Sequence, residues 1–292
     1  MVPLPSRRPR GGRDTLEKVA LLGPGLVFNL VFVVAPVLLV AAYSVAHRGR
    51  FGGVEWGFTL ENFRRALEPA YLRVLVYSFE ISIAATLLAF MIGYPTAWAI
   101  NRLPGRWRLV ALALVLIPFW TNFLIRMYAW ITLLNSQGVI NDALVRTGLT
   151  GERHTLLYNS PAVVVGLVYV YLPLMVLPIY ASLAGHSQDL VEASIDLGAS
   201  RLRSFLTVTL PLSLPGVITG CIFVLVPSLG NFVVPELLGG GKRAMVGNLV
   251  RDQFLKTQDW PFGAVLALIL VAMLLMLFWL QSSVSRRLEG TR

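Results

Sequence analysis

Charged residues and reactive side chains are scarce in this sequence. Only 14% of its 292 residues are charged, whereas about a quarter are charged in a typical soluble domain. A disulfide within the chain is excluded because Cys221 is the single cysteine, and no Cys or His spacing typical of a metal site occurs. The three histidines are widely separated and accompany no carboxylate cluster or nucleophile arrangement: His47, His154 and His186. These absences argue against a soluble domain and against a membrane enzyme.

Apolar residues, in contrast, are abundant and gathered in long windows. They make up 56% of the chain, and the mean hydropathy is +0.69. Since a helix needs roughly 20 mostly apolar residues to cross a bilayer, six windows qualify as spans. They cover about residues 19–45, 74–100, 108–134, 161–183, 214–236 and 262–283. Because windows this long and continuous favour helices over barrel strands, we expect an all-α, polytopic membrane protein with six transmembrane helices.

The basic residues lie mainly at the edges of these windows. A net charge of +10 can indicate nucleic-acid binding, but this placement is typical of membrane topology signals instead. The first window follows a basic tail, as in a signal peptide. It is longer than the roughly 7–15 residues of a signal core, so we expect a retained span. Three arginines crowd the turn at 101–108 and two directly follow the last window, which predicts that both termini are cytoplasmic.

Between the fourth and fifth windows, segment 184–213 is amphipathic and charged. Residues 192–216 read EASIDLGASRLRSFLTVTLPLSLPG, with apolar residues at roughly helical spacing. Gly198 interrupts this pattern, and Ser200 is placed to cap a second short helix. Pro211 and Pro215 then mark the entry into the fifth span. The pattern predicts a cytoplasmic helix pair with an apolar stripe that needs a partner, and we expect Gly198 to let the two helices meet closely.

The spacing of this segment resembles the cytoplasmic Glu-Ala-Ala loop of ATP-binding-cassette (ABC) importer permeases. The matching positions are Glu192, Ala193, Ser194, Gly198, Val208, Leu210 and Pro211, with Ser194 in place of alanine and Val208 in place of isoleucine. The resemblance implies the type I permease fold and makes this loop the coupling helix that docks into a groove on the ATPase subunit. We expect Glu192 to offer that dock a charge-assisted hydrogen bond. The alternative is an amphipathic helix that lies on lipid headgroups.

The same resemblance implies an assembly and a division of the chain. We expect a second permease subunit, a distinct homologue, with a second copy of this chain as the alternative. An ATPase dimer is expected at the cytoplasmic face, and a substrate-binding protein on the extracytoplasmic side. The lipid bilayer surrounds them, and no nucleic acid is involved. The expected parts are a cytoplasmic N-terminal tail at 1–16, a six-helix transmembrane permease domain at 17–285 with its coupling loop at 184–213, and a cytoplasmic C-terminal tail at 286–292. The expected location is the bacterial cell inner membrane.

No nucleotide site is expected on this chain. The sequence GGGKR at 239–243 has Glu236 where a phosphate-binding loop needs its first glycine. Arg243 follows Lys242 where Ser or Thr is needed. We therefore predict a transporter subunit that is no enzyme and binds no cofactor, with ATP-Mg held by the partner ATPase.

Further blocks resemble one branch of these permeases, that of the spermidine/putrescine importers. They are PFWTNFLIRMYAWITLL at 118–134, NSPAVVVGLVYVYLPLMVLPIYASL at 159–183, SLGNFVVPELLGG at 228–240, MVGNLV at 245–250 and DWPFGA at 259–264. The likeness extends from about residue 15 to 285 and implies polyamine import. Alternatives are a permease for another small solute, such as phosphonate, ferric ion or sulfate, and a secondary transporter or channel.

A polyamine needs carboxylates and aromatic faces along its path. Glu80 is the acidic residue placed within a span, and Arg126 lies at similar depth in the third span. Three alternatives follow: the two residues form a structural ion pair, Glu80 simply reaches the outer membrane interface, or Glu80 meets the passing ammonium group. Aromatic candidates for the path are Trp120, Tyr128 and Tyr169.

Two asparagines and an outer loop complete the expectations. Asn122 and Asn231 are predicted to make interhelical hydrogen bonds. The outer loop 237–261 carries apolar residues at near-helical spacing. It is expected to contact the binding protein, to form part of the outer gate, or to lie on the membrane interface.

Overall fold

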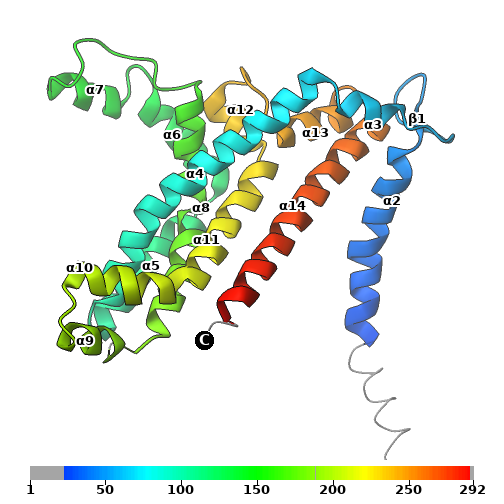
Figure 1. The fold of residues 1–292 in the computed structure, drawn as a ribbon. Coiled ribbons are helices and arrows are strands. Elements are labelled where there is room, and N and C mark those ends of the chain that lie inside the picture. Colours follow the sequence, from blue (N-terminus) through cyan, green and yellow to red (C-terminus); the bar gives the residue numbers. More distant parts are fainter. Residues whose placement is uncertain (1–22, 188, 290–292) are drawn as a thin grey trace, which may run out of the picture.

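The structure, a computed structural model, is helical throughout apart from one small hairpin (Figure 1). It describes residues 23–187 and 189–289, with side chains described up to residue 283. The all-α prediction is confirmed. The N-terminal tail predicted at 1–16 lies outside the described residues. The last helix continues to Glu289, so residues 286–289 extend that helix.

Five helices are long and apolar enough to cross a membrane. The first, Gly23–Ser44, contains the π-helical segment η1 (Leu30–Val34) and α2 (Ala35–Ser44). The others are α4 (Pro69–Asn101), α8 (Ser160–Ala184), the continuous helix Arg201–Gly230 and α14 (Trp260–Glu289). These helices correspond to five of the six predicted windows.

The sixth window, 108–134, does not form one helix. It is divided into α5 (Gly105–Trp120) and α6 (Phe123–Leu134), and the axis bends by 92° at the break. Thr121 is extended, and the Asn122 side chain caps α6 by accepting hydrogen bonds from the backbone amides of Leu124 and Ile125. The prediction that Asn122 bonds across to another helix is therefore wrong, because its carbonyl oxygen is used locally.

The fifth span begins earlier and ends earlier than predicted. Its helix starts with α10 (Arg201–Ser204), passes through the π-helical segment η2 (Phe205–Thr209) and continues as α11 (Leu210–Gly230). Pro211 and Pro215 lie inside this continuous helix and do not mark its start. The wider π turn precedes Pro211: the amide of Leu210 bonds to the carbonyl of Phe205.

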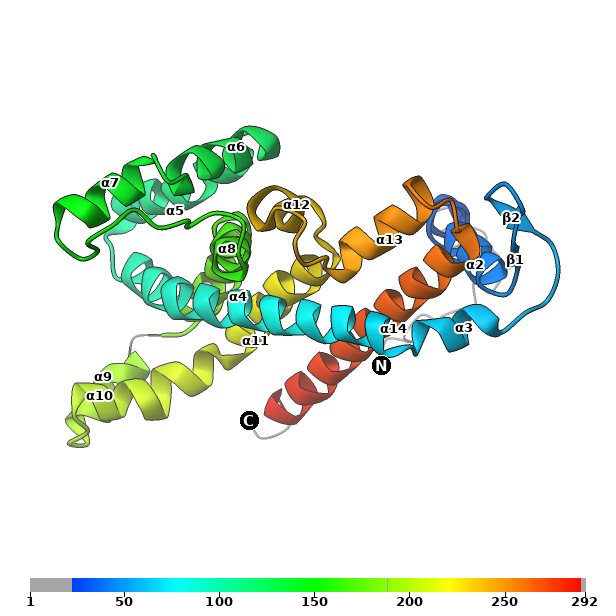
Figure 2. The same ribbon diagram turned by 90° about the horizontal axis from the view of Figure 1, so that it is seen from above.

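The core of the molecule is formed by α4, α8 and α11, which pack against one another; in Figure 2 α8 is seen nearly end-on beside the other two. Gly216 allows the close approach of α11 to α8. A Cβ there would lie 2.5 Å from the carbonyl oxygen of Pro178 and 2.5 Å from the Cβ of Ser182. Since real contacts are longer than this, any larger side chain forces the two helices apart. This tight packing makes the three helices a rigid unit.

The end of the molecule shown at the top of Figure 1 carries the short elements. They are β1 (His47–Arg48), β2 (Val54–Glu55), α3 (Glu61–Ala66), α7 (Val139–Arg146), α12 (Val233–Gly239) and α13 (Val246–Leu255). The predicted helix in loop 237–261 is confirmed as α13. The Asp259 side chain, 2% exposed, lies 3.0 Å from the guanidinium of Arg65, which ties α3 to the start of α14.

The first helix stands apart from the others, and no part of its apolar window is buried within the chain. In Figure 1 it descends alone beside the bundle and meets α14 only near the top. A helix that is apolar on all sides and unpacked needs lipid or another protein around it.

Candidate functional site

The segment that matches the Glu-Ala-Ala pattern forms a helical hairpin at the opposite end of the molecule (Figure 1). Its first arm is α9 (Asp189–Asp196), and its second arm is the start of the long helix at Arg201. The predicted order of helix, glycine break and helix is present. The second arm, however, is no separate short helix, because it continues through Gly230.

Gly198 closes α9 by its backbone conformation. Its φ is +89°, in the left-handed region that favours glycine. The amide of Gly198 donates to the carbonyl of Ile195 at 2.8 Å, and the amide of Ala199 donates to the carbonyl of Ser194 at 3.0 Å. These two bonds define a Schellman motif with glycine at the C′ position. A Cβ at Gly198 would have nothing within 4 Å, so the expectation that this glycine permits close helix contact is wrong.

Hydroxyl groups join the two arms of the hairpin. The Ser194 hydroxyl lies 2.8 Å from the carbonyl of Val191 and contacts the hydroxyl of buried Ser204. When Ser194 donates its single proton to the carbonyl, Ser204 donates to Ser194. Ser200 begins the second arm and accepts from the amide of Arg203 at 3.3 Å, as predicted for a cap. The departure from alanine at position 194 thus provides a polar link between the arms.

Aromatic rings fix the hairpin to the membrane helices. Phe205 of η2 makes edge-on contacts with Tyr94 and Trp98 of α4, at ring-centre distances of 5.8 and 6.3 Å. The Tyr94 hydroxyl lies 3.0 Å from that of Ser213, which belongs to α11. These contacts join the second arm to α4, and α4 to α11.

The exposed surface of the hairpin carries large apolar side chains among charged ones such as Arg201 and Arg203. Its exposed large side chains include Leu197, which is 89% exposed, and Leu190, Ile195, Leu202 and Leu206. Glu192 is also exposed, whereas Val208 and Leu210 are half-buried where the second arm joins the core. An exposed surface that combines large apolar side chains with charged ones is suited to contact with another protein.

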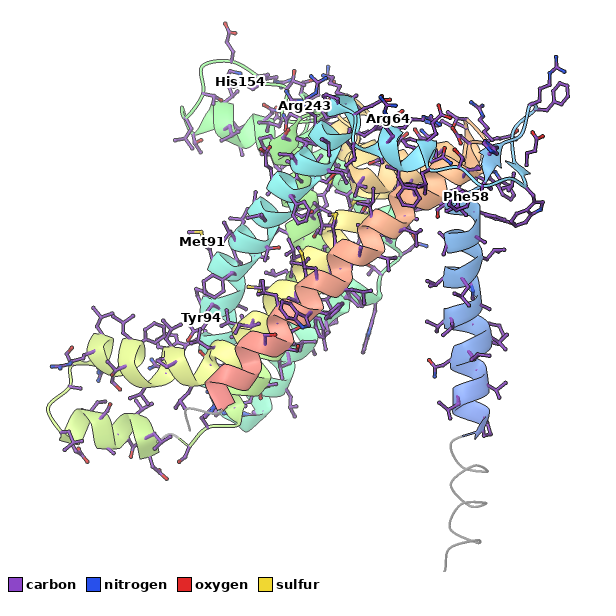
Figure 3. All side chains as sticks on the ribbon, turned by 45° about the vertical axis from the view of Figure 1, so that its right-hand side comes forward. Phe58, Arg64, Met91, Tyr94, His154 and Arg243 are labelled. Atoms are coloured by element: carbon purple, nitrogen blue, oxygen red, sulfur yellow. The ribbon has the colours of Figure 1, made fainter. Side chains whose placement is uncertain are left out.

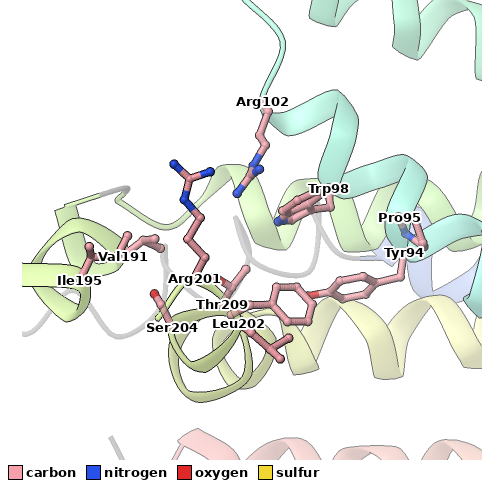
Figure 4. A pocket seen from close by; sticks show the side chains of 11 residues that line it. Tyr94, Pro95, Trp98, Arg102, Val191, Ile195, Arg201, Leu202, Ser204 and Thr209 are labelled. Carbon is pink, nitrogen blue, oxygen red and sulfur yellow. The ribbon is translucent and has the colours of Figure 1, made fainter. Parts of the chain in front are cut away.

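Two adjoining cavities lie between the hairpin and the end of α4. The larger, about 800 Å³, is lined by residues of α4 and of both hairpin arms, including Tyr94, Trp98, Arg102, Arg201 and Phe205 (Figure 4). The smaller, about 330 Å³, shares Trp98 and Arg102 and includes Glu192.

The predicted ion pair between Glu80 and Arg126 is not formed in the structure. Glu80 is exposed on the surface of α4. Arg126 is half-buried in the first turn of α6, where its guanidinium carbon lies 5.7 Å from the centre of the Phe123 ring. Its Nε atom is buried without a hydrogen-bond partner. The ion pairs recorded in residues 23–187 and 189–283 include neither side chain.

The three aromatic candidates for the substrate path are placed differently from one another. Trp120, at the break between α5 and α6, is 80% exposed, and Tyr128 of α6 is exposed as well. Tyr169 of α8 is half-buried and packs edge-on against Trp130, with ring centres 5.5 Å apart. Tyr169 therefore joins α8 to α6, whereas the other two rings face outward from this chain.

The Asn231 side chain lies at the start of the segment that leads to α12 and bonds to α8. The Asn231 side chain donates to the Tyr171 hydroxyl at 2.8 Å and accepts from the amide of Val234 at 2.9 Å. The Tyr171 hydroxyl donates in turn to the carbonyl of Pro227. The predicted interhelical bond of Asn231 is confirmed. Because the helix ends at Gly230, the amide of Val234 is available to the Asn231 side chain.

An ion-pair cluster on α12 and α13 was missed. Arg251 lies 3.0 Å from Glu236 and 2.7 Å from Asp252, and Asp252 lies 3.0 Å from Lys256. Burial alone would raise the pKa of Asp252, but hydrogen bonds from Lys256 and Arg251 hold that pKa below its usual value. Asn248 adds a bond to Glu236. The sequence signal for this cluster was Glu236, an acidic residue at the end of the predicted fifth window, which needs a partner such as Arg251.

Comparison with known proteins places the chain in a family. Residues 85–290 match the family described as "Binding-protein-dependent transport system inner membrane component". The chain belongs to this family. It is 39% identical over 253 residues to the spermidine/putrescine transport system permease protein PotB of Escherichia coli (strain K12), covering 86% of this chain and 92% of that protein. It is 38% identical over 264 residues to PotB of Haemophilus influenzae, with 89% and 91% covered.

Solved structures agree with this membership at the level of the fold. A bacterial alginate ABC transporter, in complex with alginate pentasaccharide-bound periplasmic protein, matches with a TM-score of 0.75 and 18% identity over 95% of this chain and 98% of that chain. The MetNI methionine ABC transporter in inward-facing conformations matches with a TM-score of 0.55 and 18% identity over 76% and 99%. The predicted ABC importer permease fold is confirmed, and the chain is a multi-pass protein of the inner membrane.

Proposed function

We propose that this chain is the permease subunit of an ATP-driven importer for polyamines, in which the hairpin at Gly198 receives the force of a separate ATPase. The identity of 38–39% to spermidine/putrescine permeases, over most of both chains, supports the substrate class. The family match over residues 85–290 includes the hairpin, which is well formed and exposes large apolar side chains.

The observation that carries the mechanism is the unbroken helix from Arg201 to Gly230. Its 30 residues span about 45 Å at 1.5 Å per residue. One end belongs to the hairpin, and the other ends beside α12 and α13. A push on the hairpin therefore tilts a rod that crosses the membrane, and the packed core of α4 and α8 moves with it. Rigid-body motion of this kind is how alternating access is achieved in transporters.

In this proposal the hairpin and both termini face the cytoplasm. Arg102 follows α4, and Arg106 and Arg108 lie in the first turn of α5, at the hairpin end of the molecule (Figure 1). Basic residues on that side are the arrangement favoured by the positive-inside rule. The ATPase dimer binds there and holds ATP-Mg, and this chain holds no cofactor. A binding protein delivers substrate at the opposite end, and a second permease, a distinct homologue, completes the path.

The substrate cation is proposed to meet Glu80 and exposed aromatic rings. Glu80, Trp120 and Tyr128 point out of this chain, so they are free to face the second permease across a shared path. A carboxylate and ring faces are the groups that attract an ammonium ion. Arg126 is turned toward Phe123 and leaves Glu80 unneutralised within the chain.

The test is uptake by proteoliposomes that contain the assembled importer and its binding protein. Radiolabelled spermidine is expected to accumulate only with ATP, and unlabelled putrescine is expected to compete, whereas phosphonate, ferric ion and sulfate are not. Accumulation without the ATPase would refute the importer assignment, and competition by one of the other solutes would refute the substrate class.

A variant of Glu80 tests the path. Glu80→Gln is expected to reduce spermidine uptake roughly tenfold, since a charge-assisted contact contributes about 1.5–3 kcal/mol before exposure to water weakens it. Glu68→Gln is the matched control, because Glu68 precedes the same helix outside its apolar part and is also exposed. Equal uptake by both variants would remove Glu80 from the path.

A further inference from the structure

The larger cavity beside the hairpin combines a cationic rim with an apolar wall. Arg102 follows α4, and Arg201 begins α10, so the rim is formed by two segments about 100 residues apart. In Figure 4 the two guanidinium groups point toward one another. Like charges arranged in this way repel unless an anion lies between them.

No carboxylate of the described chain neutralises the rim. The ion pairs formed within the described residues include neither Arg102 nor Arg201. Arg102 instead stacks on the ring of Trp98, 3.6 Å from its centre, which holds the guanidinium edge available for further hydrogen bonds. The Glu192 carboxylate lines the smaller, adjoining cavity, which also includes Arg102, but it does not line the larger one.

The wall below the rim is apolar and continues onto the surface of the membrane helices. Tyr94 and Phe205 belong to this wall. Pro95 is exposed beside them, and one turn back along α4 the Met91 side chain is 69% exposed and points away from the bundle (Figure 3). Leu206 of η2 is exposed as well. A charged rim beside an exposed apolar face suits an anionic lipid, whereas a soluble anion would use only the rim.

We propose that this cavity binds an anionic phospholipid of the cytoplasmic leaflet, with the phosphate between Arg102 and Arg201 and an acyl chain along Tyr94, Phe205 and Met91. The assignment of the leaflet rests on the proposed function, which puts the hairpin in the cytoplasm. Basic pockets between helices on that side are typical sites for anionic headgroups.

The bound lipid would join the hairpin to α4. Its phosphate bridges one residue after α4 and one residue at the start of the long helix, in the same place where Phe205 packs on Tyr94 and Trp98. Occupancy therefore stiffens the connection through which the hairpin moves the core. Coupling of ATP hydrolysis to transport is expected to depend on the anionic lipid content of the membrane.

The experiment labels the site directly. The assembled, detergent-purified transporter is incubated with phosphatidylglycerol that carries a photoreactive group on its acyl chain, and labelled peptides of α4 and η2 are measured by mass spectrometry. Arg102→Gln and Arg201→Gln are each expected to lower labelling at low lipid concentration roughly fivefold, as expected for one basic residue at an anionic headgroup. Arg106→Gln and Arg203→Gln are the matched controls, because these arginines are exposed neighbours that do not line the cavity.

Four outcomes decide the proposal. Selective loss in the two cavity variants, with recovery in the double Arg→Lys variant, supports it. Equal labelling in all variants, equal labelling by phosphatidylcholine, or displacement of the lipid by millimolar inorganic phosphate overturns it. The labelling requires neither ATP nor transport, so its failure is distinct from failure of the uptake assay. Thermal melting of each variant confirms that it is folded before labelling is compared.

Discussion

Replacement of Gly198 tests whether the Schellman turn is what makes the hairpin competent to dock. Gly198→Ala forces an L-residue to a φ of +89°, which costs about 1–2 kcal/mol. No steric cost is added, because a Cβ at this position has nothing within 4 Å. Gly198→Asn should cost clearly less, since asparagine tolerates left-handed backbone.

That penalty is large relative to what holds α9 in place. The helix has eight residues and none of them is buried, and an isolated helix this short is marginal in water. If the ATPase binds only the closed turn, 1–2 kcal/mol weakens its binding roughly five- to thirtyfold. Affinity is measured by surface plasmon resonance between the reconstituted permease pair and the ATPase.

The matched control is Gly241→Ala. Gly241 also has a positive φ, +67°, with nothing within 4 Å of a Cβ, but it lies in the loop after α12 at the far end of the molecule. It carries the same backbone penalty without touching the hairpin. The reasoning is refuted if Ala and Asn at position 198 weaken binding equally, or if the control weakens it as much as Gly198→Ala does.

Three further outcomes are expected from the packing and the ion pairs. Gly216→Ala should lower the free energy of unfolding by about 1–3 kcal/mol or more, and the melting temperature with it, because α8 leaves no room for a Cβ. An unchanged melting temperature would show that the helices separate freely. Asp259→Ala should cost roughly 2–3 kcal/mol, from the lost cap of α14 and the lost partner of Arg65, while Asp259→Asn should cost less, because its side-chain oxygen still caps Phe262; equal losses in the melting assay would contradict this. Since the pKa of Asp252 is lowered in the fold, its contribution is complete above the unfolded value of about 3.9 and is lost as pH falls through the lower folded value. Melting should therefore show no Asp252 contribution to pH dependence between pH 7 and 5, and an Asp252→Asn variant that differs from wild type in slope over that range would disprove it.

The sequence predicted the long apolar helices but not the break that divides one of them into α5 and α6. Five windows and the hairpin were placed correctly because hydrophobic length and the spacing around Gly198 are local signals. The break at Thr121 and Asn122 was not predicted, since an asparagine within an apolar run looks the same whether it caps a helix or bonds across to another one.

The substrate path was predictable only in part, because its residues act across elements. Glu80 and Arg126 were placed at similar depth along their helices, but depth does not give the direction in which a side chain points. The cluster around Arg251 was missed for the same reason: its partners are 15 residues apart on two helices whose mutual orientation follows from the break after Gly230. Pairings of this kind depend on tertiary geometry, which periodicity does not encode.

The π segment η2 sets the angular phase between the hairpin and the transmembrane part of its helix. Each residue advances an α-helix by about 100°, at 3.6 residues per turn, so the five residues from Phe205 to Thr209 hold one position more than a regular turn would. Deleting one residue there would restore regular winding and swing the apolar face of the hairpin about a quarter-turn around the rod. The length of this one segment therefore sets the orientation of that face about the helix axis, and with it the direction from which an ATPase subunit can act on it.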